Sequence, residues 1–181
     1  MTKVLNRKKQ VPVGIDLSLT GTGVSLGPQS LSTVRHKAPQ SPADGFRRLQ
    51  GIRAQVLSFV ALRGSVAILE GYSQASKHQA HQLGELGGVV RLALFEEGVP
   101  FYVVTPSQLK VFATGKGNSA KEQVGYSAVK RFGVEPKDNN QADALWLWEI
   151  GNHLLGEPTV ELPKTHTRAL DAIGEPVVDP S

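Results

Sequence analysis

The chain of 181 residues contains no cysteine and no apolar run near the roughly 18 residues that a membrane-spanning helix needs. The absence of cysteine excludes disulfides and thiolate metal sites, which fits a cytoplasmic protein. No apolar segment follows the basic arm over residues 1–10, so we expect neither a secretory signal nor a membrane partner. Hydrophobic residues make up 40% of the chain, enough for one soluble domain with its own core. The net charge of +4 favours a polyanionic partner.

Apolar runs and turn residues predict an α/β fold in the region 11–155. Three short strands joined by tight turns favour an antiparallel meander, and two later strands follow helical crossovers. The expected result is a five-stranded mixed sheet flanked by helices. We expect strands over 11–17, near 24, and over 31–36, 65–70 and 100–104, helices over 42–62, 79–97, 119–132 and 139–155, and a short helix that starts at Pro106. The tail over 156–181 contains four prolines and no clear periodicity, so we expect it to be extended or disordered.

Three carboxylates each belong to a different apolar segment. Asp16 ends the first strand, Glu70 ends the fourth, and Asp143 lies inside the last helix. If the first and fourth strands are parallel neighbours, Asp16 and Glu70 lie side by side at their carboxyl ends, where open α/β sheets place their sites. Taken singly, each acid also has an ordinary structural explanation, such as a turn residue, a surface acid or an acid near a helix N-terminus.

Three converging acids need a chemical reason. Burying a carboxylate without a partner is strongly unfavourable, and the three would repel one another unless cations lay between them. Carboxylate oxygens are the ligands that hard divalent cations such as Mg²⁺ prefer. In a basic protein, such a metal site indicates phosphoryl-transfer chemistry on nucleic acid.

Four segments of the chain also carry a family resemblance, and they follow one another at suitable spacing. Four motifs of one known protein family have counterparts here. The segment 14–23 is similar to the first motif of that family, 67–70 to its second, the lysine-bearing stretch 105–121 to its third, and 142–145 to its last. Together they resemble the RuvC-like Holliday-junction resolvases of the RNase H-like nuclease superfamily, especially the shorter versions typical of bacteriophages. The resemblance therefore implies an RNase H-like fold and, for a phage protein, the cytoplasm of a bacterial host.

This resemblance implies a homodimer that resolves a four-way DNA junction by paired nicks in opposed strands. Each subunit is then expected to hold two Mg²⁺ or Mn²⁺ ions. On this sequence Asp16 corresponds to the residue that bridges both ions, Glu70 to a ligand of one ion that also helps to position the water, and Asp143 to a ligand of the other.

One position departs from the family pattern. The resolvases usually carry a second ligand, acidic or histidine, one helical turn before the last aspartate, and this chain has Asn140 there. An amide oxygen can bind a hard cation but brings no charge. Asn140 is either natural, with Asp138 compensating nearby, or an engineered replacement of aspartate; Gln141 could likewise replace a glutamate.

Further candidates lie in the lysine-bearing segment and near the second carboxylate. By resemblance, Lys121 lies close to the scissile phosphate, where the first turn of a helix suits an anion. We expect Lys110 and Lys116 to contact DNA, with a solvated charged surface as the plainer reading. Tyr72, two residues after Glu70, is expected either to stack on a base or to pack within a loop.

Three glycines within five residues of one predicted helix also need an explanation, because each costs about 1 kcal/mol relative to alanine. Gly84, Gly87 and Gly88 let another backbone come close, either the sheet beneath or the same helix of a second subunit. The resemblance favours the second reading and a two-fold dimer.

Three other functions compete with a junction resolvase. A ribonuclease H acting on RNA–DNA hybrids shares the three acids but needs neither the lysine segment nor a dimer. A catalytically silent binder of branched DNA is suggested by Asn140. The segment 14–22 also resembles the phosphate loop of actin-like kinases, which need a second lobe for which the chain has no room.

Overall fold

A computed structural model describes residues 10–61, 64–71 and 80–179. Five strands form one mixed sheet in the order β3-β2-β1-β4-β5. The three antiparallel strands and the two parallel ones are as the sequence predicted. The strands are β1 (Val11–Asp16), β2 (Gly21–Ser25), β3 (Leu31–Arg35), β4 (Ser65–Glu70) and β5 (Phe101–Val104).

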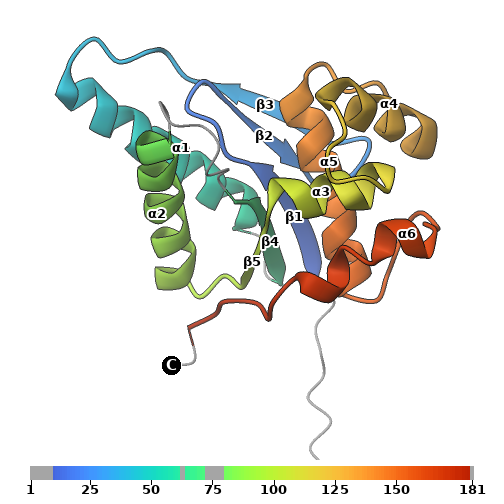
Figure 1. The fold of residues 1–181 in the computed structure, drawn as a ribbon. Helices are drawn as coiled ribbons and strands as arrows, with labels where there is room; N and C mark the ends of the chain where they lie inside the picture. Colours follow the sequence, from blue (N-terminus) through green and yellow to red (C-terminus); the bar gives the residue numbers. More distant parts are fainter. Residues whose placement is uncertain (1–9, 62–63, 72–79, 180–181) are drawn as a thin grey trace, which may run out of the picture.

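Helices cover both faces of this sheet (Figure 1). On one face lie α1 (Pro42–Val60) and α2 (Ala80–Glu96). The other face carries α3 (Pro106–Thr114), α4 (Lys121–Phe132) and α5 (Asn139–Leu154), of which α5 lies directly against the strands. No helix in the described part of the chain is long and apolar enough to cross a membrane.

The alternation of side chains along β1 and β4 assigns each residue to one of the two layers. Odd-numbered Val13 and Ile15 of β1 pack in the core cluster formed with α1 and α2. On β4, even-numbered Ile68 packs instead in the cluster formed with α5. Because successive side chains of a strand point to opposite faces, the even-numbered Asp16 and Glu70 are directed to the α5 side.

Glycines on the two central antiparallel strands let α5 lie very close to the sheet. A Cβ atom on Gly14 would overlap the backbone oxygen of Ala144, and one on Gly23 would overlap the backbone oxygen of Asn140. From the helix side, a Cβ on Gly151 would lie 2.8 Å from Ile68 Cγ1. Side chains are thus missing where the backbones of α5 and the sheet meet.

One predicted helix start was wrong by one residue. We expected Ser119 to cap the helix over 119–132, but the cap residue is Ala120, whose N–H donates to Gln123 Oε1 at 3.1 Å. The Ser119 hydroxyl instead lies 2.7 Å from Thr114 Oγ1. Lys121 is therefore the first residue of α4, still within the first turn as expected.

The tail also differs from the expectation that it would be extended or disordered. It forms α6 (Lys164–Thr167) and a short 3-10 turn, η1 (Leu170–Ala172). His166 Nδ1 lies 2.8 Å from the backbone oxygen of Phe112, and Ala169 is buried against the same core cluster as α3. Val177 then exchanges two backbone hydrogen bonds with Phe101 at the edge of β5. Tertiary contacts order this segment, and such contacts leave no periodicity in its sequence.

Replacing Gly14 with alanine is expected to lower the free energy of unfolding by about 1–3 kcal/mol or more, because the backbone of α5 must move. Gly125→Ala, inside α4, is the matched control. A Cβ there meets nothing within 4 Å, so it should stabilise the helix by about 1 kcal/mol. Urea unfolding of both variants measures the difference. Equal stability of the Gly14→Ala variant and the parent would contradict the close packing described here.

Candidate metal centre

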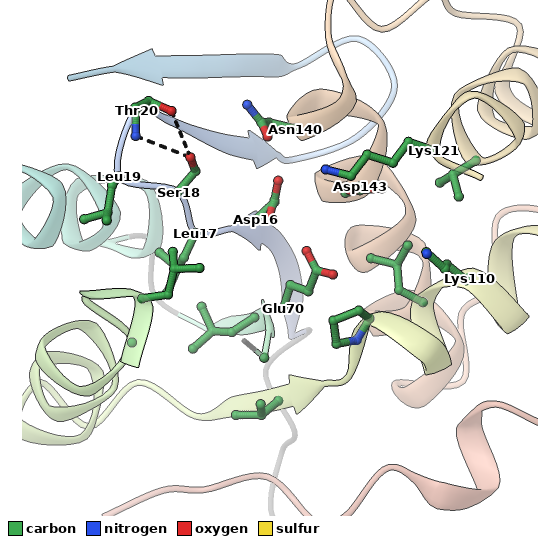
Figure 2. Close-up of a pocket in the computed structure, with 18 of the residues that line it drawn as sticks. Asp16, Leu17, Ser18, Leu19, Thr20, Glu70, Lys110, Lys121, Asn140 and Asp143 are labelled. Carbon is green, nitrogen blue, oxygen red and sulfur yellow. Dashed lines mark hydrogen bonds between the residues drawn. The ribbon is translucent and has the colours of Figure 1, made fainter. Parts of the chain in front are cut away.

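The fold brings the three predicted carboxylates together. Asp16 and Glu70 end the parallel neighbours β1 and β4, and Asp143 reaches them from the second turn of α5 (Figure 2). Each offers one oxygen, and these oxygens lie within 4.8 Å of one another. They line a pocket of about 410 Å³ that also contains Asn140 and Lys121.

Burial and mutual repulsion favour the protonated forms of these carboxyls. Asp16 is only 8% exposed, and its burial, followed by the charge of Glu70, raises its pKa well above the usual range. Burial raises the pKa of Glu70 to about 7, with the charge of Asp143 adding to the effect. Burial and then the charge of Asp16 raise the pKa of Asp143 to about 7. A divalent cation among the three would reverse this preference.

Two of the predicted lysines face the carboxylates. In Figure 2 the side chain of Lys121 extends from α4 toward Asp143, and Lys110 approaches from α3. The charge of Lys121 lowers the pKa of all three acids, and that of Lys110 lowers the pKa values of Glu70 and Asp143, although burial outweighs both. The pocket therefore combines a cluster of acids with cations along one wall.

Asn140 lies in the pocket one turn before Asp143, as its spacing predicted. Asp138, suggested as compensating for Asn140, is not a member of the carboxylate cluster, although its charge acts on Asp16. It accepts from the N–H of Gln141 at the start of α5 and from Thr33 Oγ1 at 2.8 Å on β3. Gln141 is buried and accepts from the backbone of Lys137 at 3.0 Å, so its side chain supports the helix start.

The remaining candidates occupy different places. Lys116 is exposed and does not line the pocket, and Tyr72 lies outside the described residues. Gly87 is buried in the pocket wall, where a Cβ would lie 3.6 Å from the Arg91 guanidinium. A Cβ on Gly84 or Gly88 would meet nothing within 4 Å, so the sheet does not explain these two glycines.

The sequence reasoning missed one cation of the site. Arg91 lines the pocket from α2 and donates from Nε to the backbone oxygen of Gly87 at 2.9 Å. The four-residue spacing that places it on the same helix face as Gly87 was available in the sequence. However, nothing in the sequence indicated that this face of α2 borders the carboxylates.

The donor set fits hard divalent cations and no softer metal, because every ligand in the cluster is an oxygen. A sheet with these five strands and acids at the ends of β1 and β4 has the RNase H-like fold. Fold and site together define the class of metal-dependent nucleases, whose metals act on phosphodiesters.

Comparisons with known proteins narrow this class. The family model described as "Crossover junction endodeoxyribonuclease RuvC" matches residues 13–148. A crossover junction endodeoxyribonuclease RuvC from Thermus thermophilus is 32% identical over 149 residues, covering 75% of this chain and 89% of the relative. The RuvC of Rhodococcus jostii is 31% identical over 145 residues, and the match covers 75% of this chain and 77% of that relative. The chain belongs to the RuvC family of crossover junction endodeoxyribonucleases.

Solved structures agree with this assignment. The structure of Thermus thermophilus RuvC in complex with Holliday junction substrate matches with a TM-score of 0.64 and 28% identity. That match covers 82% of this chain and 98% of the other. A second structure of Thermus thermophilus RuvC matches with a TM-score of 0.62 and 29% identity, covering 81% of this chain and 96% of the other.

The raised pKa values predict how the metal-free protein responds to pH. The unfolded chain releases the protons of these carboxyls near their ordinary pKa values of about 4, whereas the folded protein holds those of Glu70 and Asp143 up to about pH 7. Stability therefore falls as the pH rises from about 4 to about 8, by an amount on the order of a few kcal/mol. Melting temperatures measured in a chelator across this range test the prediction.

Asp143→Asn should flatten this pH dependence, because it removes one titrating group and relieves the repulsion that raises the pKa of Glu70. Asp171→Asn, on the exposed turn η1, is the surface control and should follow the parent. Parallel curves for Asp143→Asn and the parent would contradict the assigned electrostatics.

Proposed function

We propose that this protein is a metal-dependent, structure-specific DNA endonuclease that resolves Holliday junctions and other branched DNA by paired nicks. The observation that carries the proposal is the cluster of Asp16, Glu70 and Asp143 in a pocket with lysines on one wall, in a chain of the RuvC family. A bacteriophage origin and the cytoplasm of a host cell stay predictions from the resemblance.

The acids are proposed to hold two Mg²⁺ or Mn²⁺ ions. When bound, such ions ready a water for attack and stabilise the leaving oxygen of an in-line displacement. Asp16, the most buried of the three, is the proposed ligand of both ions. Glu70 binds one ion and helps to position the water, while Asp143 binds the other, with the amide oxygen of Asn140 as a neutral fourth ligand.

The lysines on the pocket wall are proposed to hold the DNA backbone. Lys121 extends toward the carboxylates and is the residue that we place nearest the scissile phosphate (Figure 2). Lys110, from α3, would contact the adjoining backbone, and the exposed Lys116 would contact DNA outside the pocket. Each phosphate that a lysine neutralises releases counterions, so binding should weaken as salt rises.

A homodimer is proposed through the outer face of α2. Gly84 and Gly88 leave open space there, and Leu92 and Phe95 continue the same face with 58% and 37% of their surface exposed. The spacing of four, four and three residues places all four positions in one line along the helix. Small residues followed by exposed apolar ones suit a second copy of α2, and a two-fold pair would present two pockets to two strands. Gly87, buried in the pocket wall, is left out of this interface.

The experiment that tests the function is cleavage of an end-labelled immobile four-way DNA junction in Mg²⁺ or Mn²⁺. We expect symmetric paired nicks in the junction and none in a linear duplex or an RNA–DNA hybrid. Asp16→Asn should abolish cutting while leaving junction binding largely intact, because it removes the proposed shared ligand. Cutting by this variant at the parental rate would contradict the role of Asp16, and cleavage of the hybrid alone would favour a ribonuclease H.

Binding without cutting needs one further variant, because Asn140 lacks the charge of the usual ligand. Asn140→Asp restores a carboxylate one turn before Asp143. If the parent protein does not cut the junction and the Asn140→Asp variant does, the parent is an inactivated resolvase. If neither cuts, the protein is a binder of branched DNA and the proposed activity is wrong.

A further inference from the structure

A second groove borders the catalytic pocket on the side away from the lysines. The volume of this groove is about 270 Å³. Leu19, in the loop after β1, lines both the groove and the catalytic pocket, so this loop separates the two. The groove is walled by residues of that loop, of the segment before α1, and of the two helices α1 and α2: Leu19, Pro39, Ser41, Pro42, Gly45, Phe46, Arg48, Leu49, Gln82 and Glu85.

The topology places this groove at the catalytic edge of the sheet. Gly21, which opens β2, pairs with Arg35 at the end of β3, so β3 ends at the same edge as Asp16. The chain then leads directly through Pro39 into α1. A nucleic acid lying over the carboxylates therefore reaches the groove without leaving this edge.

Phe46 is an aromatic side chain of the groove that belongs to neither of the two core clusters of the described residues. It lies in the first turns of α1, and 66% of its surface is exposed. The buried residues of α1 that pack on the sheet are Leu49, Ile52, Val56 and Val60, and Phe46 lies one turn before Leu49 at the exposed margin of this apolar face. An exposed phenyl ring beside a DNA-cleaving site is a surface on which a nucleobase can stack.

Arg48 differs from the other arginines of α1. Arg47 pairs with Asp44 at 2.8 Å and Arg53 with Glu96 at 3.7 Å. Arg48 is half-buried in the groove wall, and its Nε has no hydrogen-bond partner in the described part of the chain. The guanidinium is planar and permanently charged, and where Arg48 lines the groove it suits the oxygens of a phosphate.

Polar groups on the opposite wall complete the groove. Gln82 and Glu85 line it from α2 and offer amide and carboxylate groups. Such groups recognise the polar edges of bases rather than phosphates, because a carboxylate repels a phosphate but accepts hydrogen bonds from base amino groups. One groove is thus lined by a stacking ring, base-edge groups and a guanidinium, the three kinds of group that recognise a nucleotide.

We propose that this groove binds an unpaired nucleotide of branched DNA, with the base stacked on Phe46 and its phosphate on Arg48. The inference rests on the proposed function, since it assigns part of the same substrate. A protein partner would need an apolar surface larger than one exposed ring, and the groove instead mixes an aromatic ring, an arginine and two hydrogen-bonding side chains. Branched DNA supplies unpaired nucleotides where its arms meet, whereas a linear duplex does not.

The test measures the affinity of the full chain for a four-way junction and for a linear duplex of the same sequence, in an Asp16→Asn background that prevents cutting. Phe46→Ala should weaken junction binding by about ten-fold or more, the loss expected of one base–aromatic stack, and should leave duplex binding within about two-fold. Phe46→Trp should retain the affinity, because the stacking surface is kept. Arg48→Gln should weaken binding and lower the slope of its salt dependence by about one.

Arg53→Ala is the matched control, because Arg53 lies on the same helix but outside the groove. Phe46 is exposed, so its removal should leave the melting temperature nearly unchanged. If the junction binds and the Phe46, Arg48 and Arg53 variants all bind it alike, the groove is not a nucleotide site and the proposed function stands. If the Asp16→Asn protein binds no junction at all, the proposed function and this inference both fail.

Discussion

The site depends on the close approach of α5 to the central strands. A helix that packs through ordinary side chains would hold its own backbone well above the sheet, and Asp143 would not reach Asp16 and Glu70. Gly14 and Gly23 remove the side chains where the strands meet the backbone of α5, and Gly151 on the helix leaves room for the side chains of Pro12 and Ile68. The protein thus gives up side-chain packing at these three positions and gains a third carboxylate at the strand ends.

The close packing of α5 on the central strands explains the raised pKa values of the carboxyls in the pocket. Three acids with oxygens within 4.8 Å of one another disfavour their own ionisation, and burial adds to the effect. Lys121 and Lys110 offset part of the cost from α4 and α3, which pack on the outer side of α5. Arg91 adds a further cation from the other layer of the fold. The acid cluster is surrounded by cations that suit a phosphodiester, and the space among the acids suits a divalent ion.

Much of this arrangement could be predicted from the sequence, because its signals are local. The apolar runs that end at Asp16 and Glu70 predicted two buried strands whose acids meet if the strands are parallel neighbours, and the structure has this pairing. The position of Asp143 inside an apolar helix predicted its inward direction. The spacing between Asn140 and Asp143 likewise placed both in one pocket.

The parts that could not be predicted depend on contacts between distant segments. The start of α4 moved by one residue because the Ser119 hydroxyl bonds to Thr114 on another helix. The tail is ordered because Ala169 and Val177 contact α3 and β5, far away in the sequence. Tertiary packing overrides local propensity at such places.

The groove beside Phe46 and Arg48 is likewise formed by segments that are distant in the sequence. Its walls come from the loop after β1, from α1 and from α2, and no single segment of the sequence carries its pattern. On α1 alone, Arg47, Arg48 and Arg53 look equivalent as outward-facing charges. Only the contacts of Arg47 and Arg53 with acids set Arg48 apart.

The most direct test of the central claim is a calorimetric titration of Mn²⁺ into the protein at pH 7, in two buffers with different ionisation enthalpies. Carboxyls with pKa values near 7 must lose protons when a cation binds, so the heat of binding should differ between the buffers. Asp143→Asn should weaken the binding sharply and reduce the proton release, while Asp171→Asn should behave as the parent. Absence of binding, or equal binding by the parent and Asp143→Asn, would contradict a metal centre at these carboxylates.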